Sequence, residues 1–226
     1  NVIGTKNLIR LQERKGFRMI FFSSAEVYGD YSGVMREEVP EKMHIHLLND
    51  YAMTKWVGEM MIKNSAMQYG TETVIVRPFN VYGPGEDPGD FIGYAHVIPD
   101  LIKKILSGQY PLEILGSGEQ TRSFTYVTDA IEGILLVVER ATNDDFNIGS
   151  SDETKIIDLA RMLWRLCGRK EPFKVKSVST FKYDVKRRVP DISKIKSLGW
   201  KPKVRLEEGL KKVVEWYRSR TGGKLD

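Results

Sequence analysis

The chain of 226 residues lacks several features that mark special classes of protein. It has a single cysteine, Cys167, so no disulfide can form within the chain and an intracellular setting is favoured. No apolar run approaches the ~18 residues of a membrane-spanning helix. The polar first sixteen residues do not resemble a secretory leader. We therefore expect a cytoplasmic protein with no membrane association.

The chain also lacks a concentrated basic surface, although its formal net charge is +5. Basic residues are scattered apart from Lys186, Arg187 and Arg188, a pattern typical of a lysine-rich surface. No basic stripe alternates with aromatic residues, so we expect no nucleic-acid binding. A small dianionic ligand remains possible, because it needs only two or three well-placed cations. No metal site is expected.

The predicted fold class is α/β. Helix-like and strand-like segments alternate, and the early strands Arg18–Ser23 and Thr73–Arg77 are almost wholly apolar. Such strands are typical of a parallel sheet that helices cover on both faces. The other predicted strands are Leu112–Leu115, Phe146–Ile148 and Val175–Val178, and the predicted helices are Val2–Arg14, Tyr51–Gln68, Val97–Ser107, Asp129–Arg140, Lys155–Leu166 and Leu206–Tyr217.

Tyr51 and Lys55 are spaced four residues apart, so they share one face of a helix that Asp50 is predicted to cap. A lysine ammonium beside a phenol favours the phenolate and lowers the tyrosine pKa, which suits a general base. The alternative is an exposed helix pair that has this spacing by chance.

Ser24 and Glu26 follow directly on the strand Arg18–Ser23, in a predicted turn. Ligands of open α/β sheets bind beyond the carboxyl ends of the strands. At that edge Ser24 would share a proton with Tyr51 or hold a substrate oxygen, and Glu26 would be an acid or base. The alternatives are a turn hydroxyl bonded to the backbone and a solvated carboxylate.

Three motifs occur in order: Ser-Ser-x-x-Val-Tyr-Gly from Ser23, Tyr-x-x-x-Lys from Tyr51, and Arg-x-x-Asn-x-Tyr-Gly-Pro from Arg77. Together they resemble the extended short-chain dehydrogenase/reductase family, and more narrowly its NAD-dependent nucleotide-sugar epimerases and dehydratases. The resemblance extends over nearly the whole chain. It continues through Gly116–Asp129, Phe146–Gly149, Arg188–Lys194 and Leu198–Pro202.

This resemblance implies a role for each matching residue. Tyr51 takes a proton from a sugar hydroxyl, Lys55 holds the nicotinamide ribose, and Ser24 hydrogen-bonds the reacting sugar oxygen, with Glu26 as a further catalytic candidate. The implied cofactor is NAD in preference to NADP, and the implied substrate is a sugar linked to a nucleoside diphosphate. The expected cofactor-binding residues are Ser23, Tyr51, Lys55, Pro78 and Phe79, and the expected substrate-binding residues are Ser24, Asn80, His96, Val97, Arg122 and Arg188. For His96, a simple helix-start residue is the alternative.

The resemblance also implies the C-terminal part of a Rossmann-type doubly wound parallel sheet, plus a smaller α/β substrate-binding domain. Residues 1–82 and 123–150 would form the first, and residues 83–122 and 151–226 the second. The Gly-rich strand–turn–helix that holds a pyrophosphate is missing from the sequence. We therefore expect the chain to start after the first four strands, to expose residues 19–22 as an apolar sheet edge, and to bind NAD poorly alone.

The reaction within the family depends on the residues beside the catalytic hydroxyl. The 4,6-dehydratases carry Asp-Glu there and the decarboxylases Ser-Glu, whereas this chain has Ala25 and Glu26. Alanine cannot relay a proton, which favours a 4-epimerase that works through a keto-sugar. A dehydratase, a UDP-glucuronate decarboxylase and a non-catalytic nucleotide-binding sensor remain alternatives, and the nucleotide is open between UDP and GDP. A homodimer through the Tyr51 helix is expected, with candidate outward residues Met53, Trp56, Val57, Met60, Met61 and Asn64.

Overall fold

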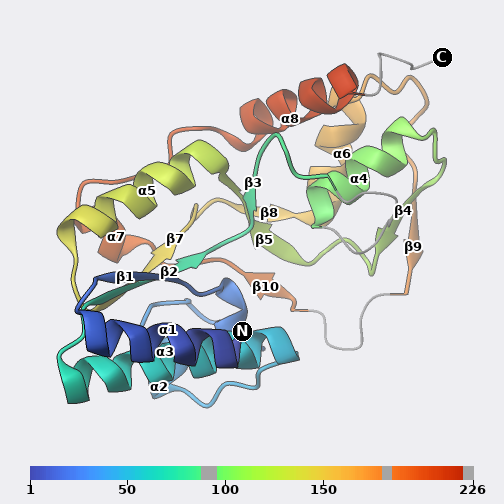
Figure 1. The fold of residues 1–226 in the computed structure, drawn as a ribbon. Helices are drawn as coiled ribbons and strands as arrows, with labels where there is room; N and C mark the ends of the chain where they lie inside the picture. Colours follow the sequence, from blue (N-terminus) through green and yellow to red (C-terminus); the bar gives the residue numbers. More distant parts are fainter. Residues whose placement is uncertain (88–95, 180–184, 221–226) are drawn as a thin grey trace.

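A parallel sheet covered by helices forms one part of the molecule, and a smaller mixed α/β part adjoins it (Figure 1). The sheet has the order β1 (Met19–Phe22), β2 (Thr73–Pro78) and β7 (Asp144–Ile148), and both strand pairs are parallel. The prediction of an α/β parallel sheet is confirmed. This computed structural model describes residues 1–87, 96–179 and 185–220.

Helices cover both faces of this sheet (Figure 1). α1 (Val2–Lys15) and α3 (Asp50–Tyr69) pack against each other on one face. α5 (Val127–Arg140) and α7 (Ser193–Ser197) lie on the other. The helices α1 and α3 each end at a glycine in the left-handed conformation, as expected from their sequences.

The central strand β2 is buried on both faces, which explains its uninterrupted apolar sequence. Side chains of successive strand residues point to opposite faces. Val74 and Val76 accordingly join the cluster under α5, while Ile75 packs with Ile9 and Ile62 under α1 and α3. The sheet therefore holds the two helical layers together.

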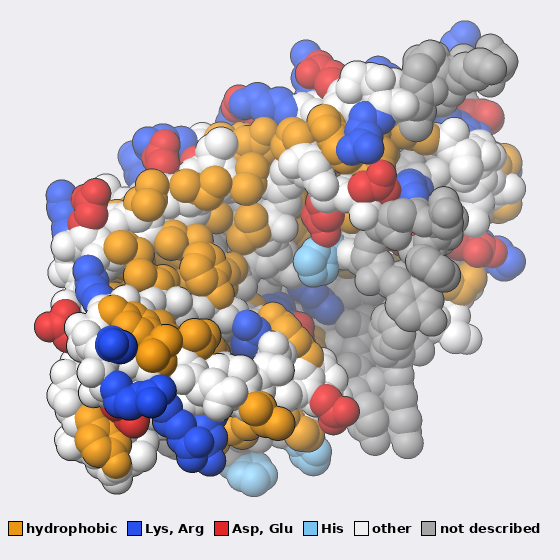
Figure 2. Space-filling view, in the orientation of Figure 1, with side chains coloured by type: hydrophobic (Ala, Val, Ile, Leu, Met, Phe, Trp, Pro, Cys, Tyr) orange, Lys and Arg blue, Asp and Glu red, His pale blue; other side chains and the backbone are white. Residues whose placement is uncertain are grey.

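The strand β1 is an edge of the sheet, since it pairs only with β2 among the described residues. Its last residue, Phe22, is 51% exposed, so the prediction that residues 19–22 form an exposed apolar sheet edge is confirmed. Ile131 and Leu135 of α5 are also exposed, and Figure 2 shows hydrophobic side chains gathered over this side of the molecule. Such a broad apolar face is unusual for a free protein surface.

The second part has its own core, formed by three amphipathic helices around paired strands. The strands β4 (Leu112–Leu115) and β9 (Val175–Val178) are parallel. α4 (Val97–Leu106), α6 (Ile156–Leu166) and α8 (Leu206–Arg220) bury their apolar stripes together. Short strands connect the two parts: β3 (Val81–Tyr82), β5 (Thr121–Ser123), β6 (Thr125–Tyr126), β8 (Glu153–Lys155) and β10 (Arg187–Arg188).

Some local predictions differ from the structure. The segment after β1 forms a 3₁₀ helix, η1 (Ala25–Tyr28), where a simple turn was predicted, and α2 (Val39–Lys42) interrupts the predicted polar loop. β3, β8 and β10 were not predicted, because pairs of two or three residues leave no periodic pattern. Residues 88–94 of the predicted site loop lie outside the described residues. Among the described helices, none has the length and apolar character that crossing a membrane requires.

Candidate active site

Tyr51 lies in the first turn of α3, and Lys55 follows one turn later. The helix is capped by Asn49, whose side chain accepts the N–H of Ala52 at 2.8 Å. The prediction that Asp50 caps the helix is therefore wrong by one residue, because Asn49 is the last residue with extended backbone. The cap fixes where the helix starts and hence the direction in which Tyr51 projects.

Lys55 reaches back toward the carboxyl end of β1. Its Nζ donates to the carbonyl of Phe22 at 2.6 Å and lies 5.6 Å from the ring centroid of Tyr51. Partial burial lowers the pKa of Lys55. Tyr51 itself is 46% exposed, so its phenol is accessible to a ligand. The structure thus brings the predicted pair together at the sheet edge where ligands of such folds bind.

Ser24 and Ser23 have different environments. The Ser24 hydroxyl accepts the N–H of Glu26 at 3.2 Å and caps η1, which leaves its proton available to donate. Ser23 is buried, and its hydroxyl donates to Glu59 of α3. Of the two serines, Ser24 is the one with a hydroxyl free to donate to a sugar oxygen.

The carboxylate of Glu26 has two partners. It forms an ion pair with Arg188 of β10 and accepts a hydrogen bond from the side-chain amide of Asn49 at 3.2 Å. The Glu26 carboxylate therefore links Arg188, on a connecting strand, to the cap of the helix that carries Tyr51.

A cavity of about 210 Å³ lies beyond the carboxyl end of β2. Asn80, His96, Val97 and Arg122, four of the expected substrate-binding residues, contribute to its wall. Arg188 does not line it but pairs directly with Arg122 in the β5–β10 ladder. The tertiary structure thus gathers residues from four separate sequence segments.

The two arginines next to this cavity are held by backbone carbonyls. Arg122 donates to the carbonyl of Val185 at 2.6 Å, and Arg188 donates to that of Gly29 at 3.4 Å. Arg188 is 5% exposed, and burial lowers its pKa to about 10. Its Nε–H has no acceptor among the described residues. A buried guanidinium with a spare donor suits an oxyanion such as a phosphate.

Asn80 and His96 line the cavity from loops. Asn80 has φ 39° and donates its side-chain amide to the carbonyl of Ser123 at 2.8 Å. His96 precedes α4, is largely exposed, and places Nδ1 2.5 Å from the carboxylate of Glu86. This hydrogen bond, together with the charge of Glu86, raises the pKa of His96.

Pro78 is the last residue of β2 and Phe79 follows it; both were predicted to border the nicotinamide. The ring of Phe79 is fully buried and lies 5.6 Å from that of Tyr28, centroid to centroid. The side chain of Phe79 therefore packs in the core, and only its backbone lies at the sheet edge.

Sequence reasoning missed Asn49, Glu59 and Glu86. Asn49 carried a usable signal, since asparagine directly before a helical pattern is a strong cap. Glu86 had none, because it lies ten positions before His96 in an irregular loop. Glu59 is buried beneath the site, which its sequence neighbours do not indicate.

Comparison with known proteins identifies the family to which this chain belongs. Residues 1–149 match the protein family described as the NAD dependent epimerase/dehydratase family. The chain belongs to this family. As a member of it, the chain has part of a Rossmann-type fold, and its relatives act on nucleotide sugars.

The relatives include more than one reaction. The chain is 36% identical to UDP-glucuronic acid decarboxylase 6 of Arabidopsis thaliana over 98% of its own length and 64% of that relative. It matches the structure of UDP-glucose 4-epimerase from Thermotoga maritima, solved with UDP-glucose, with a TM-score of 0.85, 34% identity, and coverage of 97% and 70% of the two chains.

A second solved structure carries the cofactor. UDP-glucuronic acid 4-epimerase of Bacillus cereus, in complex with UDP-glucuronic acid and NAD, matches with a TM-score of 0.84, 29% identity, and coverage of 97% and 67%. The chain spans about half to two thirds of the length of the curated relatives, from 50% to 69%.

The residues present fit one end of NAD. The ammonium of Lys55 and the phenol of Tyr51 stand together at the carboxyl end of β1, which suits a ribose hydroxyl and a reacting ring. The sequence has no Gly-rich turn opening a helix for the pyrophosphate. The residues that the structure describes at this sheet edge therefore fit the nicotinamide-ribose end of the cofactor.

Proposed function

We propose that the protein is an NAD-dependent nucleotide-sugar 4-epimerase. The observation that carries the proposal is the arrangement at one sheet edge. Tyr51, Lys55 and Ser24 lie beyond β1, and the cavity lined by Asn80 and Arg122 lies beyond β2, its neighbour in the sheet. Acid–base groups and anion-binding groups at adjacent strand ends suit a sugar attached to a diphosphate.

Each residue has a stated task in this proposal. Tyr51 accepts the proton of a sugar hydroxyl, and the Ser24 hydroxyl donates to the same oxygen as it becomes a carbonyl. Lys55 places a positive charge near the phenol and so favours the phenolate. Bound NAD would supply a reversible hydride acceptor for the sugar carbon, so that rotation of the keto-sugar could invert that carbon.

Ala25 and Glu26 support an epimerase over the other reactions. Ala25 is buried and has no proton to relay, and the Glu26 carboxylate is engaged by Arg188. The second candidate is decarboxylation of a UDP-uronic acid, which the likeness to a plant decarboxylase favours. Incubation with UDP-glucose and with UDP-glucuronate, followed by NMR, separates the two, since epimerisation inverts a sugar carbon while decarboxylation releases CO₂.

The Tyr51→Phe variant tests the catalytic assignment. We expect turnover to fall by about 10²–10⁴-fold while UDP binding is retained, because only the proton-transfer group is removed. The assay uses the protein with any sequence encoded ahead of Asn1. Tyr69→Phe, at the other end of α3 and exposed, is the matched control. Unchanged turnover in Tyr51→Phe would overturn the mechanism, and binding without any turnover in the parent would favour a sensor.

We also propose a homodimer through α1 and α3. Met53 and Met60 on α3, and Leu8 on α1, are exposed apolar side chains on helices that pack together. Two such helices from each of two copies would bury this surface. Light scattering should show a dimer for the parent and a shift toward monomer for Met60→Glu, with Gln68→Glu on the same helix as control. A parent that is monomeric at high concentration contradicts this interface.

A further inference from the structure

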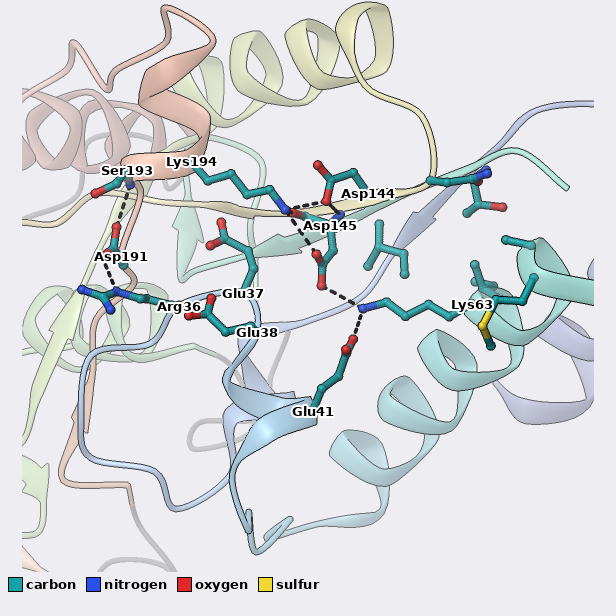
Figure 3. A pocket seen from close by; sticks show the side chains of 16 residues that line it. Arg36, Glu37, Glu38, Glu41, Lys63, Asp144, Asp145, Asp191, Ser193 and Lys194 are labelled. Carbon is teal, nitrogen blue, oxygen red and sulfur yellow. Dashed lines mark hydrogen bonds and ion pairs between the residues drawn. The ribbon is translucent and has the colours of Figure 1, made fainter. Parts of the chain in front are cut away.

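A second and larger cavity lies at the opposite edge of the sheet from Tyr51. Its volume is about 710 Å³, within the range of small-molecule sites. Thr73 and Asp144, the first residues of the parallel strands β2 and β7, line it, so it opens at the amino ends of these strands. The remaining wall comes from α2, α3 and the start of α7 (Figure 3).

The charge of this cavity is opposite to that of the chain. The whole chain carries +5, yet six carboxylates and three cations line the cavity. The cations already have carboxylate partners: Arg36 lies 3.2 Å from Asp191, and Lys63 lies 3.1 Å from Asp145. Lys194 contacts both Asp144 and Asp145. An anion would have to displace these pairs, whereas a cation meets an excess of negative charge.

Glu37 provides a specific acceptor. It is 6% exposed, and its Oε1 accepts the backbone N–H of Asn147 at 3.0 Å. Its own backbone N–H also approaches the carboxylate, and no other described residue donates to it. The side chain lies in the cavity wall between Asp191 and Asp145 (Figure 3). Burial raises the pKa of Glu37, which shows that solvent stabilises this carboxylate poorly. A donor on a ligand would complete its hydrogen bonding.

The wall formed by α3 is largely apolar, with Lys63 as its charged member. Ile62, Ala66 and Met67 project from α3, and Ile75 comes from β2. An apolar wall facing a carboxylate suits a ligand with a hydrocarbon body and one cationic head. A metal ion does not match, because no group of three or more His, Cys, Asp or Glu side chains in the described part of the chain is placed to hold one.

We infer that this cavity binds a small aliphatic amine, with its ammonium group on Glu37 and its hydrocarbon chain against Ile62 and Ala66. The site is separate from the Tyr51 edge, so it does not depend on the epimerase reaction. A binding measurement tests it whether or not the protein turns over nucleotide sugars.

The test is calorimetric titration of the protein with hexylamine and, for comparison, with 1-hexanol. We expect hexylamine to bind with a dissociation constant on the order of 1 mM, reasonable for so small a ligand, and hexanol to bind at least tenfold more weakly. Glu37→Gln keeps the acceptor for Asn147 but loses the charge. It should weaken hexylamine binding by about tenfold.

Two further variants distinguish binding in this cavity from nonspecific attraction of hexylamine to surface carboxylates. Glu215→Gln removes an exposed carboxylate on α8 and should leave the affinity unchanged. Ala66→Phe fills the apolar wall from the surface of α3 and should abolish binding with every charge retained. No hexylamine binding in the parent, equal binding of hexanol, or equal losses in Glu37→Gln and Glu215→Gln would each overturn the inference.

Discussion

Two buried arginines, Arg77 and Arg188, lie in regions of opposite character. Arg77 is fully buried under α3, and its donors reach both oxygens of Glu59, at 2.9 and 2.6 Å, and Asp145 at 2.7 Å. It also donates to the carbonyl of Glu37 and the hydroxyl of Tyr28. Burial alone would lower the pKa of Arg77, but the partner carboxylates outweigh it and raise the pKa.

Arg188 is almost as buried but has fewer partners. It contacts one carboxylate, that of Glu26, and one distant carbonyl, that of Gly29, and its Nε–H has no acceptor among the described residues. Burial lowers its pKa to about 10. The comparison teaches that burial alone does not identify a functional arginine. Every donor group of Arg77 is engaged, whereas the Arg188 Nε–H has no acceptor among the described residues.

The largest expected effect is on stability, from Arg77→Met. This change strands the buried carboxylates of Glu59 and Asp145, which should cost about 3–5 kcal/mol of unfolding free energy. Urea denaturation followed by circular dichroism measures it. Arg161→Met breaks an exposed pair with Asp158 and should cost less than about 1 kcal/mol. Similar losses for the two variants would remove the distinction between saturated and exposed arginines.

For Arg188→Met we expect the opposite result: little change in stability but a large loss of ligand affinity. Its unfolding free energy should stay within about 1 kcal/mol of the parent, because Glu26 is partly exposed and can be solvated when its partner is lost. Affinity for UDP should fall by roughly 10–100-fold with the loss of charge-assisted hydrogen bonds to phosphate. Titration calorimetry checks this. A large stability loss with unchanged UDP affinity would make Arg188 a structural residue like Arg77.

The smallest expected effect is on the pH dependence of stability and concerns Glu37, whose carbonyl accepts a hydrogen bond from Arg77. Because the folded-state pKa of Glu37 lies above the ordinary value of 4.5, folding stability is lost as pH rises through that pKa. The Glu37→Gln variant does not lose this stability, because the glutamine side chain does not ionise. It should therefore be more stable than the parent by up to about 1 kcal/mol at pH 7, with the advantage gone below pH 4.5. Urea denaturation at both pH values measures it, and a destabilised variant at pH 7 would contradict the assignment.

Much of the fold was predictable because its elements carry local signals. The apolar run of β2 and the glycines after α1 and α3 predicted their elements within a few residues. Tyr51 and Lys55 were singled out by their spacing, and the family resemblance then implied their roles. The pairing of Arg122 with Arg188 was beyond reach, because β5 and β10 are too short to show periodicity and lie far apart in the chain. The cap at Asn49 was missed in favour of its equally suitable neighbour Asp50.

The sequence by itself determined the α/β class, the family motifs and the candidate residues Ser24, Tyr51 and Lys55, since these depend on local pattern. Only the tertiary structure decided which polar groups remain available to a ligand. Ser23 is occupied by Glu59, whereas Ser24 keeps a proton to donate. The physical reason is that hydrogen-bond saturation depends on distant partners, and chain folding alone determines which partners meet.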